Sequence, residues 1–262
     1  MSEIVQLHYE NKLAKITINR PEALNSLNSE VLSSLQSTIQ QLQRMSAEDL
    51  HVVVVTGAGE KSFIAGADIK EMAQMSQSEA WDFSKRGQTI LRQLSELTAP
   101  VVAMVNGYAF GGGFELALAC DFIYASENAR FGLPEVGLGL IPGFGGTFRL
   151  ARAVGVQRAK QMIFSGISLT AAEALSAGFV QKVSATPADL DVDVKKITQM
   201  ISEKSSIAIQ SAKKSIDMSL NLSILESEKV ESRQFAETFT TADSKEGTTA
   251  FLEKRKPRFI GK

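Results

Sequence analysis

The sequence predicts an α/β fold whose first half is mixed and whose second half is mostly helical. Three observations support this prediction. Short β-type runs alternate with amphipathic helical patterns along the first half of the chain, glycine-rich turns lead from several strands into helices, and the later segments show helical spacing almost throughout. The order strand, helix, strand, glycine loop, helix, strand is typical of an α/β architecture.

The chain begins with a predicted β-hairpin. Residues 4–9 and 13–18 are short β-type runs, and Glu10-Asn11-Lys12 between them indicates the turn. Pro21 is expected to end the second strand, because proline has no backbone N–H to donate to a sheet ladder.

An amphipathic helix follows the hairpin. Asn28 is the expected N-cap, and Glu30 lies in the first turn, where an acidic side chain favours a helix start. Apolar residues then recur at helical spacing, at Val31, Leu32, Leu35, Ile39, Leu42 and Met45.

Strands and helices continue to alternate after this helix. The four-valine run within residues 51–56 predicts a buried strand, and a helix is predicted over 79–97. A strand over 100–105 then leads through Gly111-Gly112-Gly113 into a short apolar helix, and another strand is expected over 121–125.

The second half carries no sharp linker, no low-complexity tract and no repeat of fixed period. A shift in composition near residue 190 favours a core over residues 1–195 and a helical region over 196–262. Helices are predicted over 157–164, 170–177, 190–203, 206–220, 223–240 and 246–254.

Composition narrows the class of protein. The 262 residues are 44% hydrophobic and 22% charged, which suits one large α/β domain or one domain with a helical appendage. A net charge of −1 gives no field for broad binding to nucleic acids or anionic membranes. The single cysteine, Cys120, excludes an internal disulfide and fits a reducing compartment. Without a signal-like start or an apolar run of ~20 residues, we expect a cytoplasmic protein with no membrane partner.

Several familiar catalytic motifs are absent. No Gly-x-Gly-x-x-Gly follows a strand, Gly59-Glu60-Lys61-Ser62 lacks the adjacent Gly-Lys pair of a phosphate loop, and there is no Gly-x-Ser-x-Gly elbow. His8 and His51 lie far apart on or beside strand-like runs, so we expect ordinary surface or core roles for them. A metal site and a histidine-based triad are therefore not expected.

Two glutamates lie in apolar surroundings. Glu115 falls within the run from Gly111 to Cys120, and Glu135 falls within Phe131 to Gly137. An ionised carboxylate is rarely buried without a partner, because desolvation is costly. Two such carboxylates beside glycine-rich backbone indicate a dry pocket that performs proton chemistry.

Two helix starts accompany these glutamates. Residues 63–72 leave a strand and enter a helix, and Gly111-Gly112-Gly113 does the same before Glu115. The first N–H groups of a helix have no partner and attract anionic oxygens, and glycine lets a ligand approach the backbone. Two starts that face one point would form an oxyanion hole for a thioester carbonyl as it becomes an enolate.

Each feature also has a purely structural interpretation. Glu115 would offset the positive end of its own helix, and Gly111-Gly112-Gly113 would be a tight turn that lets a helix pack on a strand. Glu135 would be a solvated loop residue after Pro134, and residues 142–147 a plain loop that ends in a helix cap. Their joint occurrence in one stretch of the chain favours a site.

The same stretches resemble the crotonase, or enoyl-CoA hydratase, superfamily. Asn19-Arg20-Pro21-Glu22-Ala23-Leu24-Asn25 is similar to its N-terminal signature, and residues 250–257 to its C-terminal one, so the resemblance runs nearly end to end. The stretches that carry it are FIAGADIKEM at 63–72, NGYAFGGGFELALACD at 106–121 and FGLPEVGLGLIPGFGGTFRLARAVG at 131–155.

The resemblance implies a crotonase-like spiral of ββα units, with the active site in residues 1–195. It implies that the helical region over 196–262 drives assembly into homotrimers, commonly paired into hexamers. The expected partner is an acyl-CoA thioester, with no metal, no redox cofactor and no nucleic acid.

The same resemblance implies which residues form the site. Glu115 and Glu135 match the two catalytic glutamates of the hydratases, and the backbone N–H groups of Ala67 and Gly112 match the oxyanion hole. Phe251 and Lys254 are expected to reach the CoA of a neighbouring subunit. The substrate- and CoA-binding positions implied are Ala65, Gly66, Ala67, Asp68, Ile69, Lys70, Gly111, Phe251 and Lys254.

The implied reaction is reversible hydration of trans-2-enoyl-CoA to 3-hydroxyacyl-CoA. Phe148 and Phe114 depart from residues common in relatives, which leaves the acyl chain length open. Alternatives are an isomerase, of which many keep only one of the glutamates, and a pathway-specific dehydratase or decarboxylase. A catalytically inactive scaffold is disfavoured by the pair of glutamates. An RNA-binding protein on this fold is disfavoured because the helix over 28–46 has Arg44 as its only cation.

Overall fold

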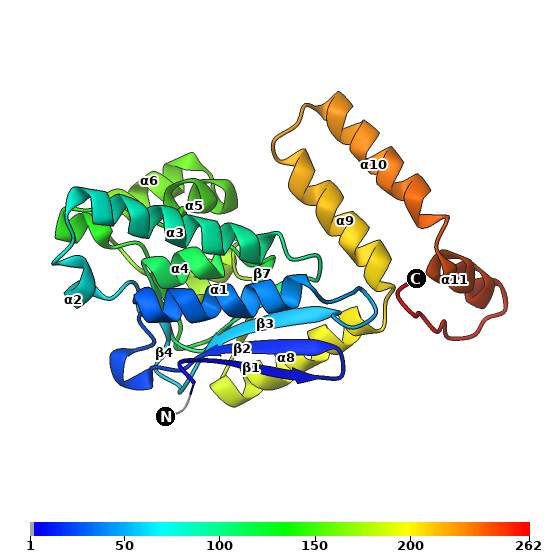
Figure 1. The fold of residues 1–262 in the computed structure, drawn as a ribbon, viewed down its shortest axis with the longest axis horizontal. Helices are drawn as coiled ribbons and strands as arrows, with labels where there is room; N and C mark the ends of the chain where they lie inside the picture. The colour runs from blue at the N-terminus through cyan, green and yellow to red at the C-terminus, as the bar shows by residue number, and fades with distance from the viewer. Residues whose placement is uncertain (1–2) are drawn as a thin grey trace.

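The computed structural model describes residues 3–262 and contains two sheets. The larger sheet has six strands in the order β1-β2-β3-β5-β7-β10, and the smaller has four in the order β4-β6-β8-β9 (Figure 1). The strands are β1 Val5–Glu10, β2 Leu13–Ile18, β3 Val52–Gly57, β4 Ser62–Ile64, β5 Val101–Val105, β6 Tyr108–Phe110, β7 Phe122–Ser126, β8 Arg130–Gly132, β9 Leu169–Thr170 and β10 Lys182–Ser184.

The predicted N-terminal hairpin is confirmed. β1 pairs antiparallel with β2, with Val5 opposite Ile18 and Glu10 opposite Leu13. Asn11 and Lys12 form the turn with φ of 51° and 66°. Two successive residues with positive φ give a turn whose twist matches that of the flanking strands.

The other strands of the large sheet run parallel, from β2 through β3, β5 and β7 to β10. Every residue of β3 and β5 is buried, as expected for a parallel sheet covered on both faces. Alternate valines of β3 divide between the faces. Val53 and Val55 pack with residues of α1 (Ser29–Gln43) and α3 (Gln77–Ser95), whereas Val52 and Val54 pack with α8 (Pro187–Ser202), on the other side of the sheet in Figure 1.

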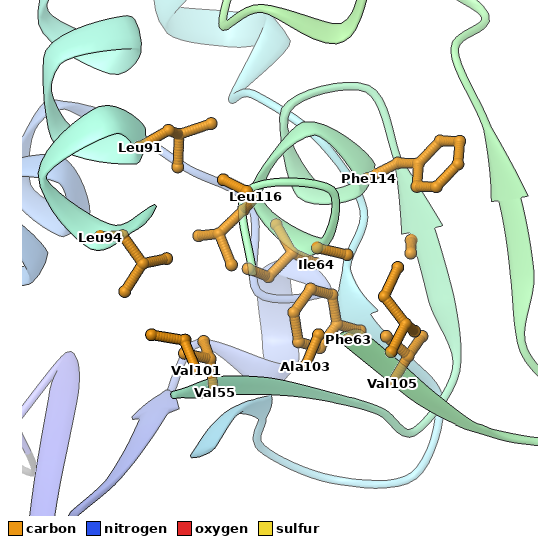
Figure 2. Packing of buried hydrophobic residues seen from close by; sticks show 14 of the residues in the cluster. Val55, Phe63, Ile64, Leu91, Leu94, Val101, Ala103, Val105, Phe114 and Leu116 are labelled. Carbon is orange, nitrogen blue, oxygen red and sulfur yellow. The ribbon is translucent and has the colours of Figure 1, made fainter. Parts of the chain in front are cut away.

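The smaller sheet was not predicted, and it is what places the candidate site. β3 is followed by β4, β5 by β6 and β7 by β8, and a helical segment follows each pair. With β1, β2 and the helical segments that follow them, the β-β-α order occurs four times in succession, in agreement with the expected spiral of ββα units. Figure 2 shows how tightly the layers meet: Phe63 of β4, Leu91 of α3, Ala103 of β5 and Leu116 of α4 (Gly112–Ala117) belong to one buried cluster.

The C-terminal part is helical, as predicted. Figure 1 shows α9 and α10 as a hairpin that stands away from the sheets, followed by α11. The predicted division at residues 195/196 falls inside α8, which packs on the large sheet, and the division into domains stays a prediction. The remaining helical segments are η1 Pro21–Ala23, α2 Ile69–Met72, η2 Glu135–Leu138, α5 Gly146–Val154, α6 Val156–Ser165, α7 Ala171–Ser176, α9 Ser206–Ser219, α10 Ile224–Thr238 and α11 Ala242–Leu252.

Candidate active site

One cavity collects the segments that the sequence analysis singled out. It has a volume of about 550 Å³ and lies where the segment after β4, the start of α4, η2 and the loop before α5 meet. The predicted residues that line it are Ala65, Gly66, Ala67, Ile69, Gly111, Gly112, Glu115 and Glu135.

Glycine is required at the start of α4. Gly111 has φ of 47°, and a Cβ on Gly113 would lie 2.0 Å from the Ile64 carbonyl oxygen. Gly113 therefore lets α4 pack against β4, as the structural interpretation of this triplet predicted. The same close packing brings Glu115, in the first turn of α4, to the cavity.

The Glu115 carboxyl is held by backbone from another segment. Glu115 is only 1% exposed. Its Oε1 accepts hydrogen bonds from the Phe144 N–H at 2.8 Å and the Gly146 N–H at 2.6 Å. Burial raises the pKa of Glu115 to about 7, with a further contribution from nearby Glu135, although both N–H groups and Arg149 oppose this shift. The carboxyl is therefore able to exchange a proton near neutral pH.

Glu135 enters the same cavity from η2. It is half-buried, and its Oε2 is buried without a hydrogen-bond partner among residues 3–262. A Cβ on Gly111 would lie 2.8 Å from its Oε1, so a glycine is what allows this carboxyl to approach the start of α4. Burial raises the pKa of Glu135. The alternative of a fully solvated loop residue does not hold, because one carboxyl oxygen is out of water.

Two backbone N–H groups of the cavity wall lack backbone acceptors. At the bridge between Leu27 and Ala67, the Leu27 N–H donates to Gly66 and the Asp68 N–H donates to Leu27. The Ala67 N–H between them donates to no backbone acceptor within the described chain. Gly112 is the first residue of α4, and a first-turn N–H has no acceptor within its helix. Both groups are free to bind an anionic oxygen.

Four predicted binding residues do not line the cavity. Asp68 caps α2, accepts from the Lys70 N–H at 3.2 Å and lies 3.5 Å from Arg20 Nη2. Lys70 is exposed beside it. Phe251, 82% exposed on α11, and Lys254 just after it are away from this cavity in the same chain, and their expected contact with a neighbouring subunit stays a prediction.

Sequence reasoning missed most of the cavity's apolar wall and the loop that holds Glu115. Ser84 of α3 fixes that loop by donating to the Gly143 carbonyl at 2.6 Å. The glycine-rich run over 142–146 indicated a loop, but its sequence does not predict that the loop contacts the Glu115 side chain. The apolar residues of the wall include Met72, Met75, Phe83, Leu138, Ile141, Phe144 and Phe148.

The chain matches the family model described as "Enoyl-CoA hydratase/isomerase" over residues 8–262. The chain belongs to this enoyl-CoA hydratase/isomerase family. It is 46% identical to the short-chain-enoyl-CoA hydratase of Clostridium acetobutylicum, covering 96% of this chain and 95% of that protein. It is 44% identical to the crotonyl-CoA hydratase of Syntrophomonas wolfei, covering 99% of both chains.

Solved structures agree with the family. The crystal structure of an enoyl-CoA hydratase from Bacillus anthracis superimposes with a TM-score of 0.95 at 37% identity, over 99% of this chain and 100% of that one. The crotonase-type α/β fold is therefore confirmed.

Across residues 3–262 none of the helices is both long and apolar enough to cross a bilayer. The same residues hold no group of three or more His, Cys, Asp and Glu suited to a metal ion, and the absence of a cofactor stays a prediction.

Proposed function

We propose that this protein catalyses the reversible hydration of a trans-2-enoyl-CoA thioester to the 3-hydroxyacyl-CoA. The observation that carries the proposal is that Glu115, Glu135 and the wall residues Ala67 and Gly112 line one cavity. The names of the relatives support the same reaction, since two of them are called hydratases of short-chain and crotonyl thioesters.

The N–H groups of Ala67 and Gly112 form the oxyanion hole. Water adds to C3 of the enoyl group only if the thioester oxygen is stabilised as it gains negative charge. Preorganised N–H donors supply this stabilisation, and the loss of one such donor typically costs ~2.7–4 kcal/mol of transition-state free energy. The lack of backbone acceptors for these two groups supports the assignment.

The two carboxyl groups divide the proton transfers. Oε1 of Glu115 is held by the N–H groups of Phe144 and Gly146, which leaves Oε2 to bind water and take its proton. Glu135 delivers a proton to C2, and its raised pKa favours the protonated acid that this step requires. The roles exchange in the dehydration direction.

The acyl group is short. The rings of Phe83 and Phe144 lie 5.2 Å apart between centroids, and both belong to the cavity wall. Phe144 is also packed against α3 and α4, because a Cβ on Gly87 would lie 2.2 Å from its ring and a Cβ on Gly112 would lie 3.2 Å from it. Both rings are buried, and this aromatic part of the wall favours a four-carbon enoyl group over a long chain.

The family description also names isomerases, and two carboxyl groups favour hydration over isomerisation. An isomerase moves one proton between two carbons of the substrate, and one carboxyl is sufficient for that. Hydration requires a base for water and an acid for carbon, which two carboxyl groups in one cavity supply.

Crotonyl-CoA hydration, followed by the loss of the conjugated-thioester absorbance, tests the proposal. We expect Glu115→Gln and Glu135→Gln each to lower kcat by at least about a hundredfold, with folding and KM largely unchanged. Glu96→Gln is the matched control, because Glu96 is exposed and its one ion pair among residues 3–262 is with Arg92 at the end of α3. Full activity in either active-site variant would remove that residue from the mechanism.

A further inference from the structure

The loop that holds Glu115 is itself held by a cation. Arg149 lies in the first turns of α5, and its Nη1 donates to the Phe144 carbonyl at 2.8 Å. The N–H of the same Phe144 donates to Glu115 Oε1 at 2.8 Å. Phe144 thus connects a guanidinium on one side to the carboxylate on the other.

A glycine in the loop allows its close contact with Arg149. Gly145 has φ of 105°, and a Cβ there would lie 2.2 Å from Arg149 Nη1 and 2.7 Å from Phe148 Cζ. The guanidinium therefore lies directly on the backbone of the loop. The positive φ at position 145 favours glycine, and a Cβ there would push the Arg149 guanidinium away from the loop.

The charge of Arg149 is also shielded from water. The Phe148 ring centroid lies 4.9 Å from the Arg149 guanidinium carbon, and Arg149 is half-buried. Burial lowers the pKa of Arg149, and Glu115 acts in the opposite direction, but an arginine stays protonated at any physiological pH. A charge in such surroundings acts on its neighbours more strongly than a solvated one.

The charged groups that act on Glu115 are few. Glu135 of η2 raises the pKa of the Glu115 carboxyl, and Arg149 of α5 lowers it. Arg152 of α5 and Cys120, beyond the end of α4, act on Arg149, and Arg152 donates to Asn221 at 2.9 Å. Arg149 is thus the cation that opposes burial and Glu135 at this carboxyl.

We propose that Arg149 is a positioning residue for the reaction: through the Phe144 carbonyl it fixes the loop whose N–H groups orient Glu115, and its charge favours the ionised form of that carboxyl, which acts as base. Arg149 does not line the cavity, so it acts through Glu115 and not on the substrate. This role rests on the proposed hydration. It adds a residue that orients Glu115 and lowers its pKa.

The test measures the ionisation of Glu115 directly and separately from activity. The full chain is prepared with isotope-labelled glutamate carboxyl carbons, and its NMR signals are titrated with pH. The Glu115 signal is the one missing from Glu115→Gln. In Arg149→Gln we expect its midpoint to rise by about one pH unit. Arg149→Lys, which keeps the charge, should stay closer to wild type, and Arg152→Gln should not move the midpoint.

Activity gives the second readout. In Arg149→Gln the rising limb of kcat/KM for crotonyl-CoA hydration should move to higher pH by the same amount as the NMR midpoint. At neutral pH kcat should fall roughly five- to tenfold, with KM nearly unchanged. Circular dichroism checks folding, and Arg149→Met, whose unbranched chain can still pack on Phe148, replaces Arg149→Gln if that variant does not fold.

An unchanged Glu115 midpoint in Arg149→Gln, or an equal rise in Arg152→Gln, would overturn the proposal. If the midpoint rises and the rate profile does not follow, the effect of Arg149 on Glu115 stands, and it is the assignment of Glu115 as the base that fails. The two failures are therefore distinguishable.

Discussion

Glu115 is the residue at which folding and the proposed chemistry oppose each other. Burial raises the pKa of its carboxyl from an ordinary 4.5 to about 7, and the N–H groups of Gly146 and Phe144 only partly oppose this shift. The folded protein therefore keeps a proton on Glu115 under conditions where the unfolded chain has released it. An active-site carboxyl of this kind should destabilise the fold when it is ionised.

This conflict predicts a pH-dependent stability difference between the wild type and Glu115→Gln. Below the unfolded pKa of 4.5 the carboxyl is protonated in both states, and its contribution to stability is fully present. As the pH rises through about 7 that contribution is lost, by about 3 kcal/mol in total. The free energy of unfolding of the wild type should fall by this amount relative to the glutamine variant, measured by urea denaturation at equal protein concentration.

The comparison reports the Glu115 carboxyl together with its electrostatic effect on Glu135, because the other titrating groups are common to both proteins. A glutamine amide oxygen can still accept from the Phe144 and Gly146 N–H groups, so the loop contact survives in the variant. A difference in unfolding free energy that does not change between acid and neutral pH would show that Glu115 is not a high-pKa group.

Among the elements, α4 shows how close packing places a side chain. Gly113 lies against β4, where a Cβ would be 2.0 Å from the Ile64 carbonyl oxygen, a backbone atom that cannot rotate away. We expect Gly113→Ala to lower the free energy of unfolding by about 3 kcal/mol or more, because either α4 or β4 has to shift. Chemical denaturation measures the loss.

Gly137→Ala is the matched control for this substitution. Gly137 lies in the short helix η2, and a Cβ there would meet no atom within 4 Å. Its free energy of unfolding should stay within about 0.5 kcal/mol of the wild type. Equal losses in the two alanine variants would mean that the α4–β4 contact is not the cause.

Some elements follow from local sequence and others do not. Asn28 was predicted to cap α1, and its side chain accepts from the Val31 N–H at 2.9 Å. The strands β4, β6 and β8 were not predicted, because each has three residues, too few to show an alternating pattern. The glutamates of the site were found because ionisable groups are unusual in apolar runs. The contact between Glu115 and Phe144 joins segments 29 residues apart, and no local pattern specifies it.

At the scale of the whole molecule, the repeated β-β-α units explain why one cavity collects distant residues. Parallel neighbouring strands end at the same edge of a sheet, so the segments that follow them lie close together. The segment after β4 supplies Ala67, the one after β6 supplies Gly112, and the one after β8 supplies Glu135. The fold therefore brings together donors and carboxyl groups that are far apart in sequence.

The C-terminal helices present apolar side chains to solvent in the single chain. On α10 Phe235 is 65% exposed, and Phe239 at the end of this helix is 64% exposed, with ring centroids 5.0 Å apart. Contiguous exposed apolar surface marks an interaction site more often than a free surface. Other large exposed apolar residues of this region are Ile216, Leu220, Ile224, Leu225, Phe251 and Leu252.

The resemblance to the crotonase superfamily implies homotrimers, and we expect this exposed apolar surface to form their interface. Sedimentation equilibrium should give a mass three times the 28.3 kDa of one chain, or six times if trimers pair. Phe239→Asp should shift the mass towards that of the single chain, because burying an unpaired carboxylate in an apolar interface is costly. Lys229→Asp, at an exposed polar position of the same helix, should leave the mass unchanged. A wild-type mass equal to one chain at micromolar concentration would contradict the expected assembly, and with it the contact of Phe251 and Lys254 with a neighbouring subunit's substrate.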